Sequence, residues 1–388
     1  MVSSFKFSRL PSIIFGNGKL SELASNLGNK PDGVVLVTGK NSLSAGSDLE
    51  RITLWLNKNK IFRVIISTEP DVEIIDETCR MLCDEKISLV IAVGGGSVLD
   101  AGKAVSAMLT VNGSIADYLE GVGTKSHPGS RMPFYAIPTT AGTGSEATKN
   151  AVISGHGENP FKRSLRHDNF VPDLAIVDPL LTLSCPPGLT AASGMDCFTQ
   201  LTEAFLSTNA SPLTDCLALE GIKAVGDSLL RAFNNGSDKE ARSGMSFAAL
   251  ASGICLANAG LGVVHGFASS VGAVTNIPHG LVCGTLMAVA NEVTVRKLMH
   301  GTGDSLSLRK YAQLGELLSG VNGKSDGYYI NWFVDYLHHL TYELKLPDLS
   351  EAGLGDDLIR SICASTESKY NPVKLDQDEL FEIITRRM

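Results

Sequence analysis

Short apolar runs alternate with longer amphipathic stretches between residues 34 and 108, and this alternation constrains the fold of the chain more than any other feature. The apolar runs, at 34–37, 63–66 and 89–93, are nearly continuous, as are strands buried on both faces of a parallel sheet. The stretches between them, 48–59 and 72–85, carry apolar residues at helical spacing. Since parallel neighbours are joined by right-handed crossovers, the pattern predicts a Rossmann-like α/β domain with helices on both faces of a parallel sheet.

The pattern of apolar residues changes after residue 178. Pro186, Pro187 and Gly188 interrupt it, and from there to the C-terminus apolar residues recur at helical spacing, with almost no strand-like run. Because 388 residues exceed the roughly 250–300 at which a single core stops growing, two domains are expected, an α/β domain at 1–184 and an all-α domain at 185–388. The expected helices include 195–207, 215–233, 241–257, 282–293, 308–317 and 330–339, and further strands are expected at 135–137 and 174–177.

Composition excludes several classes of partner. The formal net charge is −8 at pH 7 and no run of Lys or Arg offsets it locally, so no nucleic acid partner is expected. No stretch reaches the roughly 18 uninterrupted apolar residues of a membrane-spanning helix, and residues 1–18 do not resemble a signal peptide, so a cytoplasmic protein without membrane contacts is expected. The eight cysteines are too dilute for a disulfide scaffold. Cys79 and Cys83, without a His or acidic partner at ligand spacing, are interpreted as packing residues.

Three consecutive glycines, Gly94, Gly95 and Gly96, followed by Ser97, connect a strand-like run to a helix-like stretch. Such a turn lets a phosphate approach the backbone closely, and the amides and the dipole of the helix N-terminus attract its charge. The alternative is a tight turn that needs glycine only for steric reasons. The motif is neither the spaced-glycine dinucleotide fingerprint nor a Walker A loop, because Ala104 replaces the Ser or Thr that would follow the lysine.

A second polar loop, PTTAGTGSE at 138–146, follows another predicted strand. It brings together Thr139, Thr140 and Thr143, whose hydroxyls, with backbone amides, suit the phosphates or the adenine of a nucleotide. Two such loops in one α/β domain favour a dinucleotide as the ligand.

Five motifs punctuate the chain in order. They are Phe15-Gly16-x-Gly18 ahead of a Leu-rich segment, GGGS with Asp100 and Lys103, PTTAGTGSE, AIVDP at 175–179 and SGMD at 193–196. With Asn371 and Pro372 near the C-terminus, they make the chain resemble the iron-containing, group III alcohol dehydrogenases over nearly its whole length. The resemblance implies the dehydroquinate synthase-like two-domain architecture and a homodimer or larger homo-oligomer.

In that family the first loop binds the pyrophosphate of the cofactor, and the threonine-rich loop contacts its adenine and phosphate side, in agreement with the residues themselves. By this resemblance the cofactor-binding residues are Gly39, Gly94, Gly95, Gly96, Ser97, Asp100, Thr139, Thr140, Thr143, Thr148, Lys162 and Leu183.

Gly39 stands where the family tends to carry an acidic residue that holds the adenosine ribose. Without a carboxylate a 2′-phosphate is not repelled, and Lys40, Asn41 or Ser42 could contact it. NADP is therefore favoured over NAD. The alternative is that Gly39 simply turns the chain and that the enzyme uses both cofactors.

Asp196 and Gln200 lie four apart in a helical segment and share a face, while His265 and His279 each begin a His-Gly pair. From spacing alone, core histidines and metal ligands remain equally open. Relatives bind iron or zinc through an Asp, a His four residues later and two histidines fourteen residues apart, which implies a divalent metal at Asp196, Gln200, His265 and His279. Gln200 replaces a histidine of that pattern and is the weaker donor. Either Gln200 is the fourth ligand, or it holds a water that fills the gap, or the site binds no metal.

The resemblance implies hydride transfer between C4 of the nicotinamide and a carbonyl or carbinol carbon, in a cleft between the domains, with the metal polarising the substrate oxygen. No catalytic base is assigned, since Ser269 replaces a histidine that many relatives have near the nicotinamide. The expected activity is that of an NAD(P)-dependent alcohol dehydrogenase or aldehyde reductase acting on a small-molecule alcohol or aldehyde. The alternatives are a metal-independent carbonyl reductase of the maleylacetate reductase type and a non-catalytic nucleotide-binding paralogue. A dehydroquinate synthase is disfavoured because few Arg or Lys lie near the metal motifs.

Overall fold

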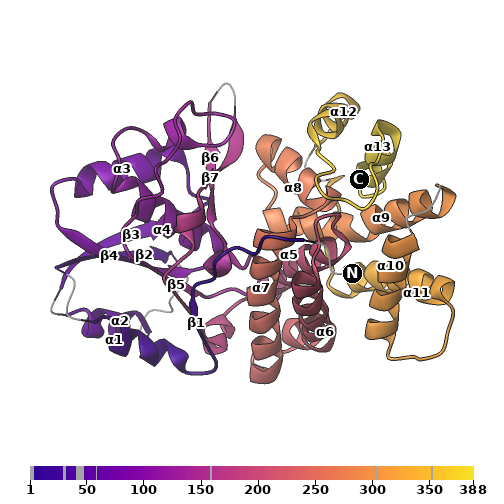
Figure 1. The fold of residues 1–388 in the computed structure, drawn as a ribbon, viewed down its shortest axis with the longest axis horizontal. Helices are drawn as coiled ribbons and strands as arrows, with labels where there is room; N and C mark the ends of the chain where they lie inside the picture. Colours follow the sequence, from indigo (N-terminus) through magenta and orange to yellow (C-terminus); the bar gives the residue numbers. More distant parts are fainter. Residues whose placement is uncertain are drawn as a thin grey trace. The chain divides into compact units, whose positions relative to one another are not determined.

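The computed structural model describes residues 4–28, 32–40, 48–57, 59–157, 160–301, 305–350 and 353–388. The chain forms two compact units, Ser8–Cys185 and Pro186–Met388, and the described residues 4–7 group with the second. The first unit holds the sheet and the second is built from helices (Figure 1).

A six-stranded sheet forms the centre of the first unit. Its strands lie in the order β1, β8, β5, β4, β2, β3, and every neighbouring pair is parallel. Their bounds are β1 Ser12–Phe15, β2 Gly33–Gly39, β3 Lys60–Ile66, β4 Ile87–Gly94, β5 Phe134–Pro138 and β8 Leu174–Val177. The predicted parallel sheet is confirmed, because five of these strands contain the five apolar runs. Only β1, an edge strand of four residues, is not apparent from the sequence pattern.

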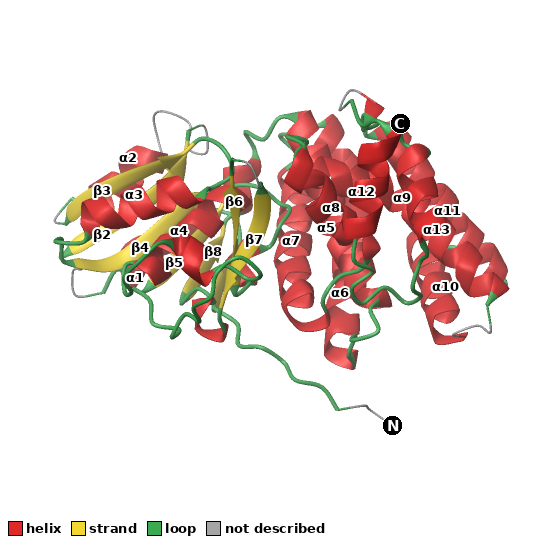
Figure 2. Ribbon diagram, turned by 90° about the horizontal axis from the view of Figure 1, so that it is seen from above, coloured by secondary structure: helices red, strands yellow, loops and turns green. Residues whose placement is uncertain are grey.

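Helices cover both faces of the sheet (Figure 2). They are α1 Glu22–Asn26, α2 Asp48–Trp55, α3 Val72–Leu82 and α4 Gly96–Met108. Val34 of β2 faces the core that includes Ile52 of α2, whereas the next residue, Val35, faces the core that includes Leu99 of α4. Both faces of the central strands are therefore buried, which explains why their sequences are apolar without alternation.

A two-stranded antiparallel ribbon, β6 Asn150–Gly155 and β7 Phe161–Arg166, forms a second small sheet. Burial alternates along β6, and its polar residues hide it from a search for apolar runs. Two side chains of α4, a helix that packs on the main sheet, form hydrogen bonds with the ribbon. Asp100 Oδ2 accepts a hydrogen bond from Val152 N at 3.0 Å, and Lys103 Nζ donates to the first carbonyl of β6 at 2.7 Å.

The Asp178 carboxylate joins two of the sequence motifs, FGNG and AIVDP. Its oxygens accept hydrogen bonds from Gly18 N at 3.0 Å, Leu20 N at 2.9 Å and Leu180 N at 3.1 Å. Gly18 has a φ of +78°, a left-handed conformation that favours glycine. These motifs therefore build one corner of the unit, where β1 pairs with β8.

The second unit is helical, as predicted. Its helices are α5 Pro187–Leu206, α6 Pro212–Asn234, α7 Lys239–Ala259, α8 Val263–Val274, α9 His279–His300, α10 Ser305–Ser319, α11 Asp326–Glu343, α12 Asp356–Ser365 and α13 Gln377–Thr385. The six predicted helical segments fall on α5, α6, α7, α9, α10 and α11. Within the described ranges no single helix is long and apolar enough to cross a membrane, and α7 with α8 passes that test only as a pair bent by 96°.

Helix α5 packs against α6, α7 and α9. From Gly194 to Leu206 every one of its residues is buried. Besides two threonines, this stretch buries a carboxamide and two carboxylates, those of Gln200, Asp196 and Glu203. Burial of such groups costs free energy unless they find partners, so they mark the stretch of α5 where a functional site is expected.

Candidate functional site

The glycine turn lies where the order of the sheet reverses. Strand β2 continues to β3 on one side, whereas β4 continues to β5 on the other, so the chain changes direction between β2 and β4. Gly39 and Gly94 are the last residues of these two strands. In open α/β sheets, ligands bind outside the carboxyl ends of the strands at such a point.

The two predicted loops contact one another. Thr139 N donates a hydrogen bond to Gly94 O at 2.9 Å. A Cβ atom on Gly96 would lie 2.7 Å from Thr143 Cγ2, and one on Gly95 would lie 3.3 Å from Thr140 Oγ1. The close approach of the threonine loop is thus a steric reason for the glycines.

The same turn can also attract an anion. Gly95 is the N-cap of α4, and no side chain caps that end of the helix. The amides of Gly96 and Ser97 begin a thirteen-residue helix, and uncapped amides at a helix N-terminus attract anions. Steric need and phosphate binding are therefore compatible at this turn.

Asp100, Lys103 and Thr148 form a buried network below the loops. Lys103 Nζ donates to Ser145 O at 3.0 Å and Thr148 Oγ1 at 3.0 Å, and Ser145 Oγ donates to Asp100 Oδ1 at 2.5 Å. Burial lowers the pKa of Lys103 to about 8 and raises the pKa of Glu146 to about 7. The hydrogen bonds of Asp100 and Thr148 are thus made within the protein, where they shape the threonine loop.

The remaining predicted cofactor residues are dispersed. Lys162, on β7, forms an ion pair with Glu69, with Nζ 2.5 Å from Oε1. Leu183 is half-buried and follows a short 3-10 turn at Pro179–Thr182. Lys40 is exposed just beyond β2. Asn41 and Ser42 lie outside the described residues.

Asp196, His265 and His279 converge in the helical unit, from α5, α8 and α9 respectively. Asp196 Oδ1 lies 3.3 Å from His265 Nε2 and 3.7 Å from His279 Nε2. Burial alone would raise the pKa of Asp196, but the neighbouring imidazoles of His265 and His279 hold it below its ordinary value. These three side chains, predicted from spacing and resemblance, do meet.

The glycine of each His-Gly pair has a steric reason. A Cβ on Gly266 would lie 2.2 Å from Glu367 O, and one on Gly280 would lie 2.6 Å from Ala192 O. Gly280 lies in the first turn of α9, and its lack of a side chain lets α9 approach α5 closely beside Asp196. The pairs thus combine a candidate ligand with a close helix contact.

The polar atoms of the site fit a bound cation. Asp196 Oδ1 and Gln200 Oε1 are buried and accept no hydrogen bond within the described chain. Buried acceptors without a donor are costly, and a cation held by Asp196 and the two histidines would satisfy Asp196 Oδ1. Gln200 Nε2 faces Asp196 Oδ2 at 3.5 Å, so in this conformation the amide donates to the carboxylate.

Glu203, which the sequence analysis missed, supports His265 from behind. Its Oε2 lies 2.7 Å from His265 Nδ1, and its Oε1 accepts a hydrogen bond from Val264 N at 2.7 Å. Histidine ligands of metals commonly donate their second nitrogen to such a carboxylate, which fixes the tautomer and ring orientation. In the sequence, Glu203 could have been identified by its position seven residues after Asp196, on the same face of α5.

Cys283 was missed as well. It lies one turn after His279 on α9, is fully buried, and places Sγ 3.7 Å from His265 Nε2. The candidate ligand atoms of Asp196, His265, His279 and Cys283 all lie within 4.8 Å of one another. Burial raises the pKa of the Cys283 thiol to about 12, so without a cation it is neutral.

Ser269 lies one turn after His265 on α8. Its hydroxyl donates to the His265 carbonyl at 2.9 Å, a common arrangement for serine within a helix. The side chain is therefore engaged by its own backbone.

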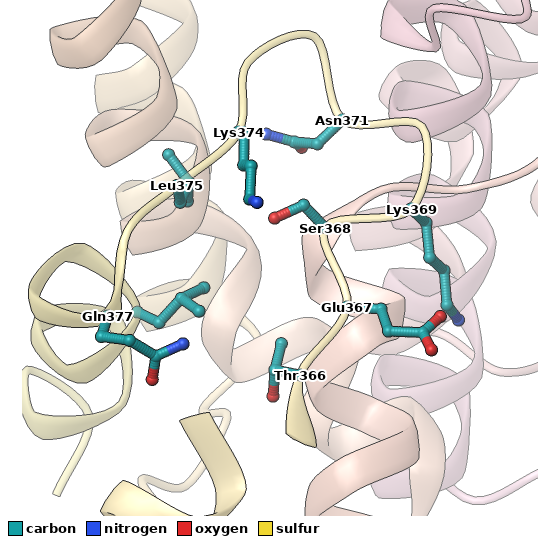
Figure 3. A pocket seen from close by; sticks show the side chains of 9 residues that line it. Thr366, Glu367, Ser368, Lys369, Asn371, Lys374, Leu375 and Gln377 are labelled. Carbon is teal, nitrogen blue, oxygen red and sulfur yellow. The ribbon is translucent and has the colours of Figure 1, made fainter. Parts of the chain in front are cut away.

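A separate pocket of about 470 Å³ lies along the segment between α12 and α13. In Figure 3 the side chains of Lys374 and Ser368 point toward each other across it. Asn371, from the last motif of the resemblance, also lines it and donates to Val373 O at 2.8 Å. This motif therefore shapes a loop, and none of the predicted site residues lines the pocket.

The chain matches the family described as "Iron-containing alcohol dehydrogenase" over residues 11–179 and its C-terminal counterpart over residues 190–388. It is 34% identical to alcohol dehydrogenase 4 of Saccharomyces cerevisiae, covering 97% of this chain and 96% of that protein. It is 30% identical to an NADPH-dependent butanol dehydrogenase of Clostridium saccharobutylicum, again covering 97% and 96%. Its structure is similar to that of sulfoacetaldehyde reductase from Bifidobacterium kashiwanohense in complex with NAD+, with a TM-score of 0.85, 27% identity and 99% of each chain covered. The chain therefore belongs to the iron-containing alcohol dehydrogenase family.

Proposed function

We propose that this NAD(P)-dependent alcohol dehydrogenase interconverts a small alcohol and its aldehyde, prefers NADP to NAD, and holds a divalent metal at Asp196, His265 and His279. The observation that carries the proposal is the convergence of these three side chains, from three helices, on one buried point. Iron and zinc suit a set of imidazole and carboxylate donors.

Nucleotide binding by the first unit is supported by the position of the glycine turn at the reversal of strand order. The uncapped N-terminus of α4 suits the pyrophosphate, and the hydroxyls of Thr140 and Thr143 lie against the same turn. Gly94, Gly95, Gly96 and Ser97 would contact the phosphates through their backbone.

A preference for NADP is supported by Gly39. A carboxylate at the end of β2 would repel a 2′-phosphate, and this chain has none there. Lys40, exposed at the next position, offers a positive charge. One relative is named as NADPH-dependent.

A divalent metal held at Asp196, His265 and His279 would supply Lewis-acid polarisation of the substrate oxygen and would stabilise the negative charge that develops there. The chain's own residues prepare the site for it. Glu203 holds the ring of His265 so that Nε2 faces Asp196. Gln200 Nε2 donates to Asp196 Oδ2, the oxygen that does not face the histidines. Because these side chains are buried and held in place, they lose little conformational entropy when a metal binds. The site is therefore preorganised.

We also propose that the protein works as a homo-oligomer in the cytoplasm. The family resemblance supports the oligomer. No disulfide bond joins the eight cysteines, all of which lie in the described part of the chain, and Cys83 and Cys216 are exposed, as expected for a reducing compartment. Sedimentation velocity on the purified protein tests the assembly, and a monomer would contradict it.

Oxidation of NADPH and NADH by the purified protein, followed by absorbance with a panel of short-chain aldehydes, tests the main proposal. NADPH should be consumed faster than NADH. Dialysis against a chelator should abolish the activity, and added Zn²⁺ or Fe²⁺ should restore it. Nucleotide binding without turnover of any aldehyde would overturn the proposal, and full activity after chelation would overturn its metal-dependent part.

A further inference from the structure

We propose that the Cys283 thiolate is the fourth protein ligand of the metal at Asp196 and the two histidines, in the role that the resemblance gives to Gln200. The inference rests on the metal site of the proposed function and extends it to a thiolate donor. Nothing in the spacing of the family pattern assigns this cysteine.

Two of the interatomic distances match those of a single tetrahedral ion. With Zn–N of about 2.0–2.1 Å and Zn–S of about 2.3 Å, a bound nitrogen and sulfur lie about 3.6 Å apart, and a bound nitrogen and oxygen about 3.4 Å apart. The Cys283 Sγ to His265 Nε2 distance is 3.7 Å, and the His265 Nε2 to Asp196 Oδ1 distance is 3.3 Å. The two pairs of atoms thus have the separations expected for neighbouring corners of a coordination tetrahedron.

The fold holds Cys283 in this position. It is four residues after His279 on α9, so the two side chains project from one face of the helix. The neighbouring Gly284 has no room for a side chain, since a Cβ there would lie 2.9 Å from Met195 Cβ on α5. Cys283 is 0% exposed, and its Sγ lies within 4.8 Å of the other candidate ligand atoms, so the thiol is directed into the cluster.

Gln200 presents the wrong atom for a ligand. Its Nε2, a donor, faces Asp196 Oδ2 at 3.5 Å, whereas a metal needs the amide oxygen. A thiolate is also a far stronger donor than a neutral amide for zinc or iron. Gln200 therefore acts as a positioning residue for Asp196, while Cys283 replaces the imidazole that relatives carry.

Thiolate coordination has an optical signature that is independent of catalysis. The full-length protein, stripped of metal with a chelator, is titrated with Co²⁺, and a thiolate ligand gives a sulfur-to-cobalt charge-transfer band in the near ultraviolet. Binding also releases the thiol proton to the buffer. We expect one equivalent of Co²⁺ to give this band.

Variants then identify the sulfur. C283S and C283A should lose the band and bind the metal at least about 10-fold more weakly by chelator competition, since even residues behind the ligands change affinity by that much. C255S is the matched control, because Cys255 is equally buried, lies on α7 and contacts Thr214 O. Q200A should keep the band. Circular dichroism checks that each variant is folded.

The outcomes separate this inference from the proposed function. Co²⁺ that binds with ligand-field bands alone, or a band that survives in C283S but vanishes in C255S, overturns the role of Cys283 and leaves the metal-dependent dehydrogenase standing. Failure of the wild type to bind Co²⁺ overturns both the ligand and the metal site. In that case NADPH turnover still reports separately on whether the protein is a reductase.

Discussion

Glu203 Oε2 lies 2.7 Å from Nδ1 of His265 and thereby directs the opposite nitrogen of that ring toward Asp196. The carboxylate reaches the imidazole from α5, whereas the histidine belongs to α8. Both side chains are buried, so the pair fixes the orientation of a candidate ligand before any metal binds.

Replacing Glu203 by Gln should weaken metal binding by about 10- to 100-fold, because the amide cannot accept from both His265 Nδ1 and Val264 N as the two carboxylate oxygens do. Competition with a chromophoric chelator measures the affinity. Glu220→Gln, at an exposed position of α6, serves as the control. Equal affinities of the two variants would show that Glu203 does not support the site.

Replacing Gly39 by Asp should change the choice of cofactor. A carboxylate at the end of β2 would repel a 2′-phosphate and accept hydrogen bonds from a 2′-hydroxyl. We expect the ratio of kcat/KM for NADPH over NADH to fall by about 10-fold or more, which corresponds to about 1.4 kcal/mol. Steady-state kinetics with one aldehyde and both nucleotides measures the ratio, and a value unchanged from the wild type would contradict the assignment.

Replacing Gly96 by Ala should separate the two nucleotide loops. The new methyl group would lie 2.7 Å from Thr143 Cγ2. Such overpacking destabilises a folded protein by about 1–3 kcal/mol. The dissociation constant of NADPH, followed by its fluorescence, should rise by about 10-fold or more. Gly188→Ala, where a Cβ meets nothing within 4 Å, should leave it unchanged. A similar weakening in both variants would refute a specific role for the turn.

The buried Glu146 should give stability a distinct pH dependence. Burial raises its pKa from 4.5 to about 7, despite the nearby charge of Lys103. Between those values the folded protein holds a proton that the unfolded chain has released, so the free energy of unfolding falls as pH rises through this window, by up to about 3 kcal/mol.

Glu146→Gln cannot ionise and should escape that loss. Urea unfolding of the nucleotide-free proteins at several values between pH 5 and pH 8 measures the difference. The advantage of the variant should grow with pH up to about 7 and then level off. A difference that stays constant with pH would contradict the raised pKa.

Several elements were accessible from the sequence because their cause is local. Strands β2 and β4 are apolar without alternation because both faces are covered, and this signal persists whatever helices cover them. The turn from Gly94 to Ser97 was evident because consecutive glycines between a strand-like run and a helix-like stretch are typical of a tight turn. Asp196, His265 and His279 were found through spacing and resemblance, and they do converge.

Other features were not accessible. The ribbon of β6 and β7 is held by buried Asp100 and Lys103 rather than by apolar packing, so no periodicity marks it. Asp100 and Thr148 carry the family motif, yet their hydrogen bonds inside the protein became visible only when the loops were in place.

The amino-acid sequence by itself determined the strands, the helices and the residue types available for chemistry, since these depend on neighbours within a few positions of one another. The tertiary structure decided which of these residues meet. Cys283 became a candidate ligand and Glu203 a support for His265 because α9 packs against both α5 and α8 and so brings residues of the three helices together. Such contacts join residues up to 87 positions apart, and their geometry is set by the packing of whole helices, which no local pattern encodes.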